Sequence, residues 1–221
     1  SNLNPRIIAL DGQPVAPHEV DGALRIAPGM RIDLILDPEG APGSRVSIDD
    51  SFYEGLEFPL TDVVYSDTPL RADPLTTPIA LPPNPIPEPQ AETSTRHEVV
   101  FGGGMMGSSA SGKMDWTVNG VAASGHNLEP VLTLPRGKSV ILTLRNETAW
   151  WHPIHLHGHS FRVLSRNGKP TRYREWQDTV LTAPHEIVEV AFVADNPGDW
   201  MFHCHILEHQ AAGMMATIRV T

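Results

Sequence analysis

Two short segments near the end of the chain concentrate the side chains that could do chemistry. Residues 152–158 read His-Pro-Ile-His-Leu-His-Gly, residues 203–209 read His-Cys-His-Ile-Leu-Glu-His, and Met214 follows the second segment. Cys204 is the only cysteine, so an intrachain disulfide is excluded, and roles in packing, nucleophilic attack or metal binding stay open. Imidazole, thiolate and thioether groups bind transition metals, and the two segments therefore indicate a metal site.

The spacing within each segment assigns these side chains to two faces of a strand. Successive strand residues point to opposite faces, so His155 and His157 share a face. For the same reason His203 and His205 share a face, and Cys204 points away from both. His152 stands three residues before His155, which puts it on the Cys204 side of a regular strand. Because Pro153 follows His152, the face on which His152 lies stays open.

Two ligand sets follow from this alternation. The first combines one thiolate, two imidazoles and one thioether, from Cys204, His152, His209 and Met214. Two nitrogens, a thiolate and a weak axial methionine characterise blue-copper electron-transfer sites, whereas zinc prefers a regular tetrahedron and has little use for methionine. The second set is all imidazole and suits a copper cluster, with His155, His157, His203 and His205.

The elements that must position these residues are predicted to be β-strands. Short apolar runs rich in Val, Ile, Leu and Thr are separated by 21 prolines and 18 glycines, which is typical of an antiparallel all-β protein. One helical turn is expected after Cys204, around residues 207–209. The strands expected around the histidine segments are 114–118, 131–134, 139–145, 154–164, 187–193, 199–205 and 214–220.

A repeated pattern predicts two domains. Strand-like residues 24–26 and 31–36 flank the turn Pro28-Gly29, and residues 131–134 and 139–144 flank a similar turn, which indicates a duplicated β-sandwich. A proline-rich stretch between the copies predicts an extended connector. We therefore expect the latter part of a domain at 1–72, a linker at 73–95 and a complete domain at 96–221. A small independent β domain is the alternative for 1–72, which is short for a sandwich of roughly 100 residues.

The composition argues against some classes of binding partner. A formal net charge of -10 argues against nucleic acid and anionic membranes, since both attract positive surfaces. No apolar run approaches the roughly 20 residues that a membrane-spanning helix needs. The chain opens on Ser1 without a secretion-signal pattern, which carries no information about its compartment.

The two histidine segments resemble the C-terminal copper signatures of multicopper oxidases. The resemblance covers most of residues 96–221, including residues 118–120, 176–180 and a hairpin expected at 134–146, while residues 1–72 look like the second half of the family's middle cupredoxin domain. The ending from Glu208 to Met215 is similar to bacterial cuprous oxidases and spore-coat laccases.

The resemblance implies cupredoxin-like Greek-key sandwiches and specific ligand roles. Type 1 copper would be held by His152, Cys204, His209 and axial Met214. Type 2 copper would be held by His155, and the type 3 pair by His157, His203 and His205. The implied activity is oxidation of a phenol or Cu(I) coupled to reduction of O2 to water. The rival hypothesis is an electron-transfer or copper-binding module that uses only the type 1 site.

The resemblance also implies partners and a location. Half of the family's cluster histidines come from an N-terminal domain, and this chain has no further His-x-His motif, so an N-terminal part or a second chain is expected to supply them. The family further implies a periplasmic or extracellular location.

A few residues depart from the pattern or carry weaker signals. Gln210 replaces a glutamate that is common in similar bacterial relatives, and a glutamine cannot donate a proton as an acid, so Asp178 or a residue outside the chain is an alternative proton source. Asp178 could equally orient a ligating histidine. Met105 and Met106 could capture Cu(I), although a flexible loop is the favoured interpretation. The isolated histidines are expected to serve packing or the surface, namely His18, His97, His126, His159 and His185.

Overall fold

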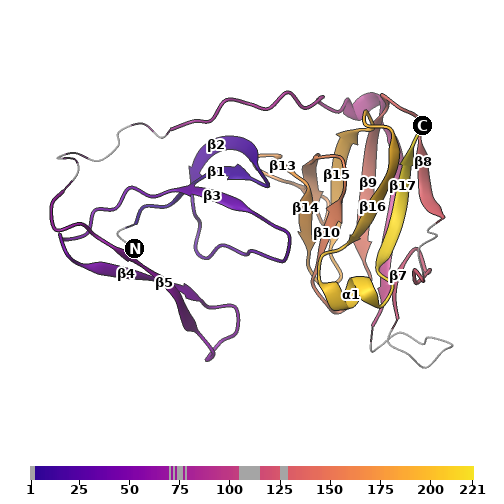
Figure 1. Ribbon diagram of the computed structural model, residues 1–221. Coiled ribbons are helices and arrows are strands. Elements are labelled where there is room, and N and C mark those ends of the chain that lie inside the picture. Colours follow the sequence, from indigo (N-terminus) through magenta and orange to yellow (C-terminus); the bar gives the residue numbers. More distant parts are fainter. Residues whose placement is uncertain are drawn as a thin grey trace.

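The computed structural model describes residues 3–69, 71, 73, 77, 79–104, 115–124 and 129–221. Two parts lie side by side, an N-terminal segment (residues 3–69) and a C-terminal sandwich that begins at Thr95, and an extended connector runs along one edge of both (Figure 1). Among the described residues, no helix is long and apolar enough to cross a membrane.

The N-terminal segment holds a three-stranded sheet and a separate hairpin. The sheet has the order β2-β1-β3, from β2 (Gln13–Glu19), β1 (Arg6–Leu10) and β3 (Ile32–Ile35). The hairpin pairs β4 (Arg45–Asp50) with β5 (Phe58–Val64). The strand expected at residues 24–26 was wrong. Residues 24–26 form no ladder with another strand, and Ile26 is 61% exposed, so this run buries too little apolar surface to form a packed strand.

The connector is extended, as its prolines predict. Residues 79–90 form no strand, because proline has no N–H for a ladder, and the stretch ends in the short 3-10 helix η1 (Ala91–Thr93). Glu88 accepts hydrogen bonds from the Arg162 guanidinium at 2.8 and 3.0 Å, which fixes the connector to the C-terminal sandwich. The division at 73–95 stays a prediction.

The C-terminal sandwich contains two sheets. One has the order β14-β10-β16-β17-β8, from β14 (Thr179–Thr182), β10 (His152–Leu156), β16 (Gly198–Cys204), β17 (Met215–Val220) and β8 (Pro130–Leu134). The other has the order β12-β11-β15-β9-β6-β7, with β13 beside β11, from β12 (Lys169–Pro170), β11 (Phe161–Arg166), β15 (Ile187–Val193), β9 (Ser139–Asn146), β6 (Thr95–Gly103), β7 (Trp116–Val118) and β13 (Trp176–Gln177). Helix α1 (Leu207–Ala211) follows β16 where the sequence predicted a helical turn.

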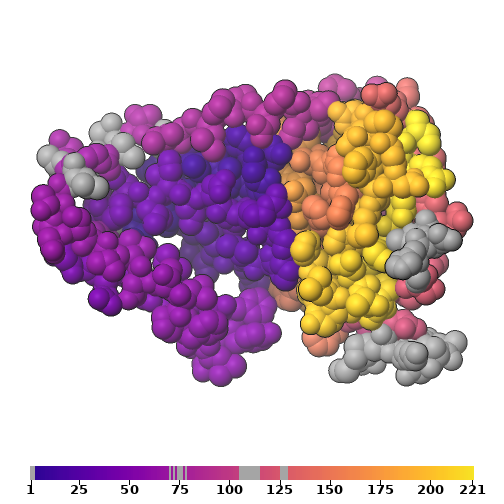
Figure 2. Space-filling view, viewed as in Figure 1, coloured from indigo at the N-terminus to yellow at the C-terminus, as the bar shows by residue number. Residues whose placement is uncertain are grey.

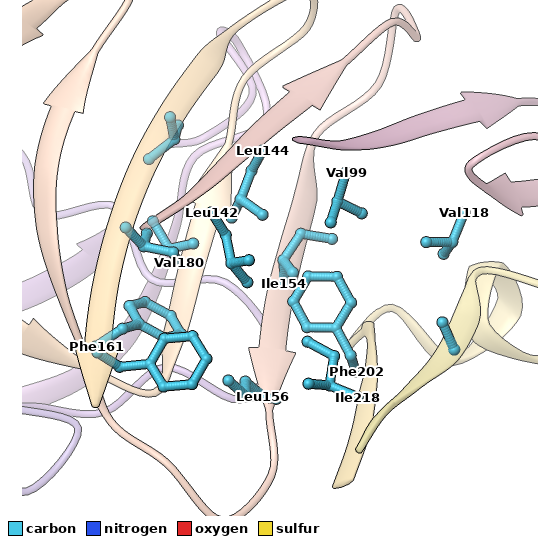
Figure 3. Packing of buried hydrophobic residues seen from close by; sticks show 14 of the residues in the cluster. Val99, Val118, Leu142, Leu144, Ile154, Leu156, Phe161, Val180, Phe202 and Ile218 are labelled. Atoms are coloured by element: carbon cyan, nitrogen blue, oxygen red, sulfur yellow. The ribbon is translucent and has the colours of Figure 1, made fainter. Parts of the chain in front are cut away.

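The core lies between the two sheets. Alternate residues point inward, as in Phe161 and Val163 of β11. Figure 3 shows Leu142 of the same sheet packed with Ile154 and Phe202 of the other sheet. Burying each such large apolar side chain contributes about 1.5–3 kcal/mol. Cys204 and Met214 belong to this same buried cluster, so the candidate metal site is built into the core.

Two details of the expected strand pattern were wrong. The strand predicted at 154–164 is two strands in different sheets, because the chain turns after His157. Gly158 allows this turn with a φ of 71°, and a Cβ there would lie 2.4 Å from the Trp200 ring. The segment 134–146 is no hairpin, since β8 pairs with β17 and β9 with β6 and β15 in the opposite sheet.

Candidate metal centre

Strands β10 and β16 bring the two histidine segments together. They pair antiparallel with Ile154 opposite Cys204 and His155 opposite His203. Because residues directly opposite share a face, the imidazoles of His155 and His203 lie on one side of this sheet, and the Cys204 sulfur lies on the other side with the core. The structure thus places Cys204 on the face opposite to His155 and His203, as the strand alternation predicted.

The first set, called the Cys204 site below, consists of His152, Cys204, His209 and Met214. The Cys204 Sγ lies 3.7 Å from His152 Nδ1 and 3.6 Å from His209 Nδ1, and the two Nδ1 atoms lie 3.1 Å apart. Among the described residues, His152, Cys204 and His209 form the only group of three or more His, Cys, Asp or Glu residues whose ligand atoms all lie within 4.8 Å of one another. Helix α1 carries His209 back to the strand end, as the sequence predicted.

Backbone hydrogen bonds tie Met214 to two other residues of the Cys204 site. Its N–H donates to the His209 carbonyl at 2.9 Å, and its own carbonyl accepts from the Cys204 N–H at 3.1 Å. The Met214 side chain is fully buried in the same cluster as Cys204. The four predicted type 1 ligands therefore converge, and their role as ligands stays a proposal.

Asn146 and Thr148 orient His152, and no spacing pattern in the sequence points to either residue. Asn146 donates from its amide to the carbonyls of Trp150 and Ala183, so its oxygen accepts from Thr148 Oγ1 at 2.8 Å. The Thr148 hydroxyl proton is thereby used, and its oxygen accepts from His152 Nε2, 2.7 Å away. This chain of hydrogen bonds leaves the His152 lone pair on Nδ1, which faces the sulfur of Cys204.

Trp116 covers the two imidazoles of the Cys204 site. Its ring centroid lies 4.1 Å from that of His209 and 5.1 Å from that of His152, and the residue is only 3% exposed. Trp150 is 46% exposed and packs edge-on against Trp116. The indole of Trp116 thus excludes water from the metal-facing atoms on this side.

Burial sets the protonation states of the Cys204 site. It lowers the pKa of His152 to about 3 and, to a lesser degree, lowers that of His209. Both imidazoles are therefore neutral at pH 7 and can offer lone pairs to a metal. Burial raises the pKa of the Cys204 thiol to about 12, so the free site holds a thiol. Only a bound cation would stabilise the thiolate there, which fits a metal site.

The second set, called the imidazole cluster below, consists of His155, His157, His203 and His205. Five ring pairs within it have centroids between 4.8 and 5.8 Å apart. The Nε2 atoms of His157 and His203 lie 3.1 Å apart. His203 Nδ1 donates to the Cys204 carbonyl at 2.9 Å, which leaves its lone pair on Nε2, and burial lowers its pKa to about 4. Imidazole nitrogens gathered in this way suit copper.

Asp178 contacts His155, which was one of two roles predicted for it. His155 Nδ1 donates to the Asp178 main-chain carbonyl at 2.9 Å and lies 3.4 Å from its carboxylate. Burial opposes ionisation of Asp178, but hydrogen bonds from Arg31, His155 and Thr179 outweigh it and hold its pKa well below the usual range. A carboxyl that stays ionised is a poor proton source, so this position favours an orienting role.

The remaining histidines and polar residues do not join the two sets. His18 stacks on Tyr173 at 4.0 Å, and His159 is buried against Phe192 and Trp200, in agreement with packing roles. The Gln210 amide reaches only the Met215 sulfur, at 4.0 Å. Three predictions lie outside the described residues, those for Met105, Met106 and His126.

Comparison with known proteins decides the family. The family model described as multicopper oxidase matches residues 102–221. The chain belongs to the multicopper oxidase family. A multicopper oxidase of Mycobacterium tuberculosis, MmcO, is 33% identical over 92% of the chain and 39% of its own length. The laccase-2 of Fomitopsis schrenkii is 40% identical over 40% of the chain and 18% of its own length.

Solved structures of multicopper oxidases confirm the predicted fold. The crystal structure of the enzyme from Pseudomonas thermotolerans is similar with a TM-score of 0.82 and 31% identity, over 99% of this chain and 50% of that one. The enzyme from Pseudomonas parafulva matches with a TM-score of 0.76 and 34% identity, over 99% of this chain and 51% of that one. The cupredoxin-like sandwich prediction is thus confirmed, and this multicopper oxidase chain spans about half the length of those structures.

Copper is the cofactor of this family, and the donor atoms present fit it. One thiol, two neutral imidazoles and a buried thioether form the donor set of a blue-copper site, and the all-imidazole cluster lies directly across strand β16. The membership, the fold and the cofactor predicted from the sequence are confirmed.

Proposed function

We propose that this chain forms the C-terminal part of an oxidase that couples one-electron oxidation of a phenol or Cu(I) to reduction of O2 to water. Type 1 copper would be held at the Cys204 site, type 2 copper by His155, and the type 3 pair by His157, His203 and His205. Bound copper would supply the redox chemistry, since it accepts single electrons and passes them to dioxygen. Four electrons and four protons convert one O2 into two water molecules.

The observation that carries the proposal is the position of Cys204 between His203 and His205. The three residues are consecutive, and their side chains reach two donor sets on opposite faces of one strand. Covalent bonds therefore join the two sets directly, which is the shortest route an electron can take between them. A pure electron carrier needs the Cys204 site but has no use for the imidazole cluster.

The remaining parts of the proposal concern what the chain does not contain. We propose that an N-terminal part or second chain supplies the other cluster histidines, and the support is that the chain spans only half of its structural relatives. We also propose a periplasmic or extracellular location, which membership of the multicopper oxidase family supports.

Copper content and oxygen consumption of the full-length protein test the function. With a phenolic reductant, the wild type is expected to consume O2 continuously, whereas a carrier would lose its blue colour once and stop. The variant His157→Gln should keep the blue colour and lose O2 consumption, and Cys204→Ser should lose the colour. His97→Gln, outside both sets, is the matched control. Continuous O2 consumption by His157→Gln at the wild-type rate would contradict the proposal.

A further inference from the structure

A turn of the N-terminal segment lies directly against the imidazole cluster. The turn closes through a hydrogen bond from the Met30 N–H to the Ala27 carbonyl at 3.0 Å, and it presents Gly29 to His205. A Cβ on Gly29 would lie 2.5, 2.8 and 3.0 Å from three atoms of the His205 ring. Figure 2 shows the indigo and violet surface of this segment against the orange and yellow surface of the sandwich. The backbone of Gly29 therefore limits where the His205 ring can go.

The space beside this contact allows the ring to move if the contact changes. A cavity of about 430 Å³ adjoins it, lined by Pro28, Gly29, His205, Ile206, Leu207 and Glu208. The sandwich alone leaves the His205 side chain room on this side. The turn of the N-terminal segment supplies the wall that the sandwich lacks.

Arg31, two residues after Gly29, joins the same turn to the opposite side of the cluster. Its guanidinium donates to both carboxylate oxygens of Asp178 at 2.8 and 2.7 Å, and to the Gly29 carbonyl at 2.8 Å. A paired guanidinium–carboxylate contact fixes both distance and plane, which a single contact would not. The turn and Asp178 are consequently held as one unit.

Asp11 fixes the backbone around Asp178. One of its carboxylate oxygens accepts from the N–H groups of Asp178 and Thr179, both at 3.0 Å, and the other accepts from the Arg31 N–H at 2.9 Å. Asp11 is 4% exposed, so these bonds compete little with water. His155 binds to this framework through the Asp178 carbonyl, at 2.9 Å, and Thr179 Oγ1, at 3.0 Å.

We propose that the turn Pro28–Arg31 of the N-terminal segment positions two imidazoles of the cluster. Gly29 sets the ring of His205 by direct contact, and Arg31 sets the ring of His155 through Asp178. The proposal rests on the proposed function, because it assigns these imidazoles to copper. In this arrangement Gly29, Arg31 and Asp11 are positioning residues, and the segment that carries no ligand of the cluster still determines its geometry.

Two variants of the full-length, copper-loaded protein test the proposal. Gly29→Ala should displace the His205 ring and reduce the copper retained by the cluster, with the blue colour of the Cys204 site preserved. Its control is Gly22→Ala, which has a similar positive φ, 72° against 84°, but no atom within 4 Å of the new Cβ. Both substitutions strain the backbone alike, and only Gly29→Ala meets an imidazole.

Arg31→Gln should change the electron paramagnetic resonance signal of type 2 copper, which His155 is proposed to hold. The expected loss of copper affinity is about 10-fold to 100-fold, as for other residues that orient metal ligands. Arg31→Lys keeps the charge without the paired contact and should restore affinity only in part. Arg45→Gln is the control, because Arg45 pairs with Asp62 on the separate hairpin.

The outcomes separate this proposal from the proposed function. A wild-type protein without cluster copper would overturn the function itself. A wild type with a normal cluster, together with an unchanged resonance signal in Arg31→Gln and full copper retention in Gly29→Ala, would overturn the positioning. If Gly29→Ala fails to fold, the Arg31→Gln signal alone decides.

Discussion

Nδ1 of His152 lies 3.7 Å from Sγ of Cys204, although 52 positions of the chain separate the two residues. The contact arises because β10 and β16 are neighbours in one sheet, with Ile154 opposite Cys204. The imidazole is neutral, and its Nδ1 faces the sulfur because Nε2 is held by Thr148. The residues that hold the ligands of the Cys204 site can therefore be tested.

Thr148→Val should weaken copper binding at the Cys204 site by about 10-fold to 100-fold. Valine has nearly the shape of threonine but cannot accept the hydrogen bond from His152 Nε2, so the ring loses the contact that fixes its tautomer. A titration with a copper chelator, followed by the blue absorption, measures the change. The control is Thr217→Val, the same substitution at a buried threonine of β17. Equal affinities in the two variants would refute the role of Thr148.

Trp116→Phe should lower the reduction potential of the Cys204 site. The smaller ring leaves room for water near His209 and His152, and a more polar surrounding favours the oxidised, more highly charged ion. A redox titration of the blue colour measures the potential, with Trp176→Phe as a control at a buried tryptophan beneath Arg162. A potential that rises or stays unchanged would count against the shielding role.

Acid should weaken the contact between the N-terminal segment and the sandwich through Asp178. Its pKa is lower in the fold than in the unfolded chain, so its ionised form stabilises the fold above the unfolded pKa of about 3.9. This stabilisation declines as the pH falls below about 4 and is lost as the pH passes the folded pKa. Burial raises the pKa of Asp11, so the contribution of Asp11 to the stability of the fold increases as the pH falls.

The comparison of wild type with Asp178→Asn measures the contribution of the Asp178 carboxylate, including its effect on Asp11, whose pKa the Asp178 charge raises. The difference in unfolding midpoint should shrink between pH 7 and pH 3, as denaturant unfolding at several pH values would show. Asp199→Asn removes an exposed pair with Arg219 and should give a much smaller difference, since water screens it. A difference for Asp178→Asn that stays constant with pH would exclude the ionised carboxylate as its source.

The sequence alone determined on which face of a strand several candidate ligands lie. Strand alternation placed Cys204 opposite to His203 and His205, because a side-chain period of two holds in any strand. The sequence also predicted a short helical turn after Cys204, where α1 lies.

Tertiary structure decided the rest. Leu24 to Ile26 read as a strand but stay largely exposed and pair with no strand, and residues 154–164 divide between two sheets because Gly158 allows a sharp turn. Arg31 and Asp178 are 147 positions apart, so no local pattern could pair them. Thr148 accepts a hydrogen bond from His152 because the Thr148 hydroxyl donates its own proton to Asn146. Such contacts depend on how the sheets and segments pack, which local periodicity does not encode.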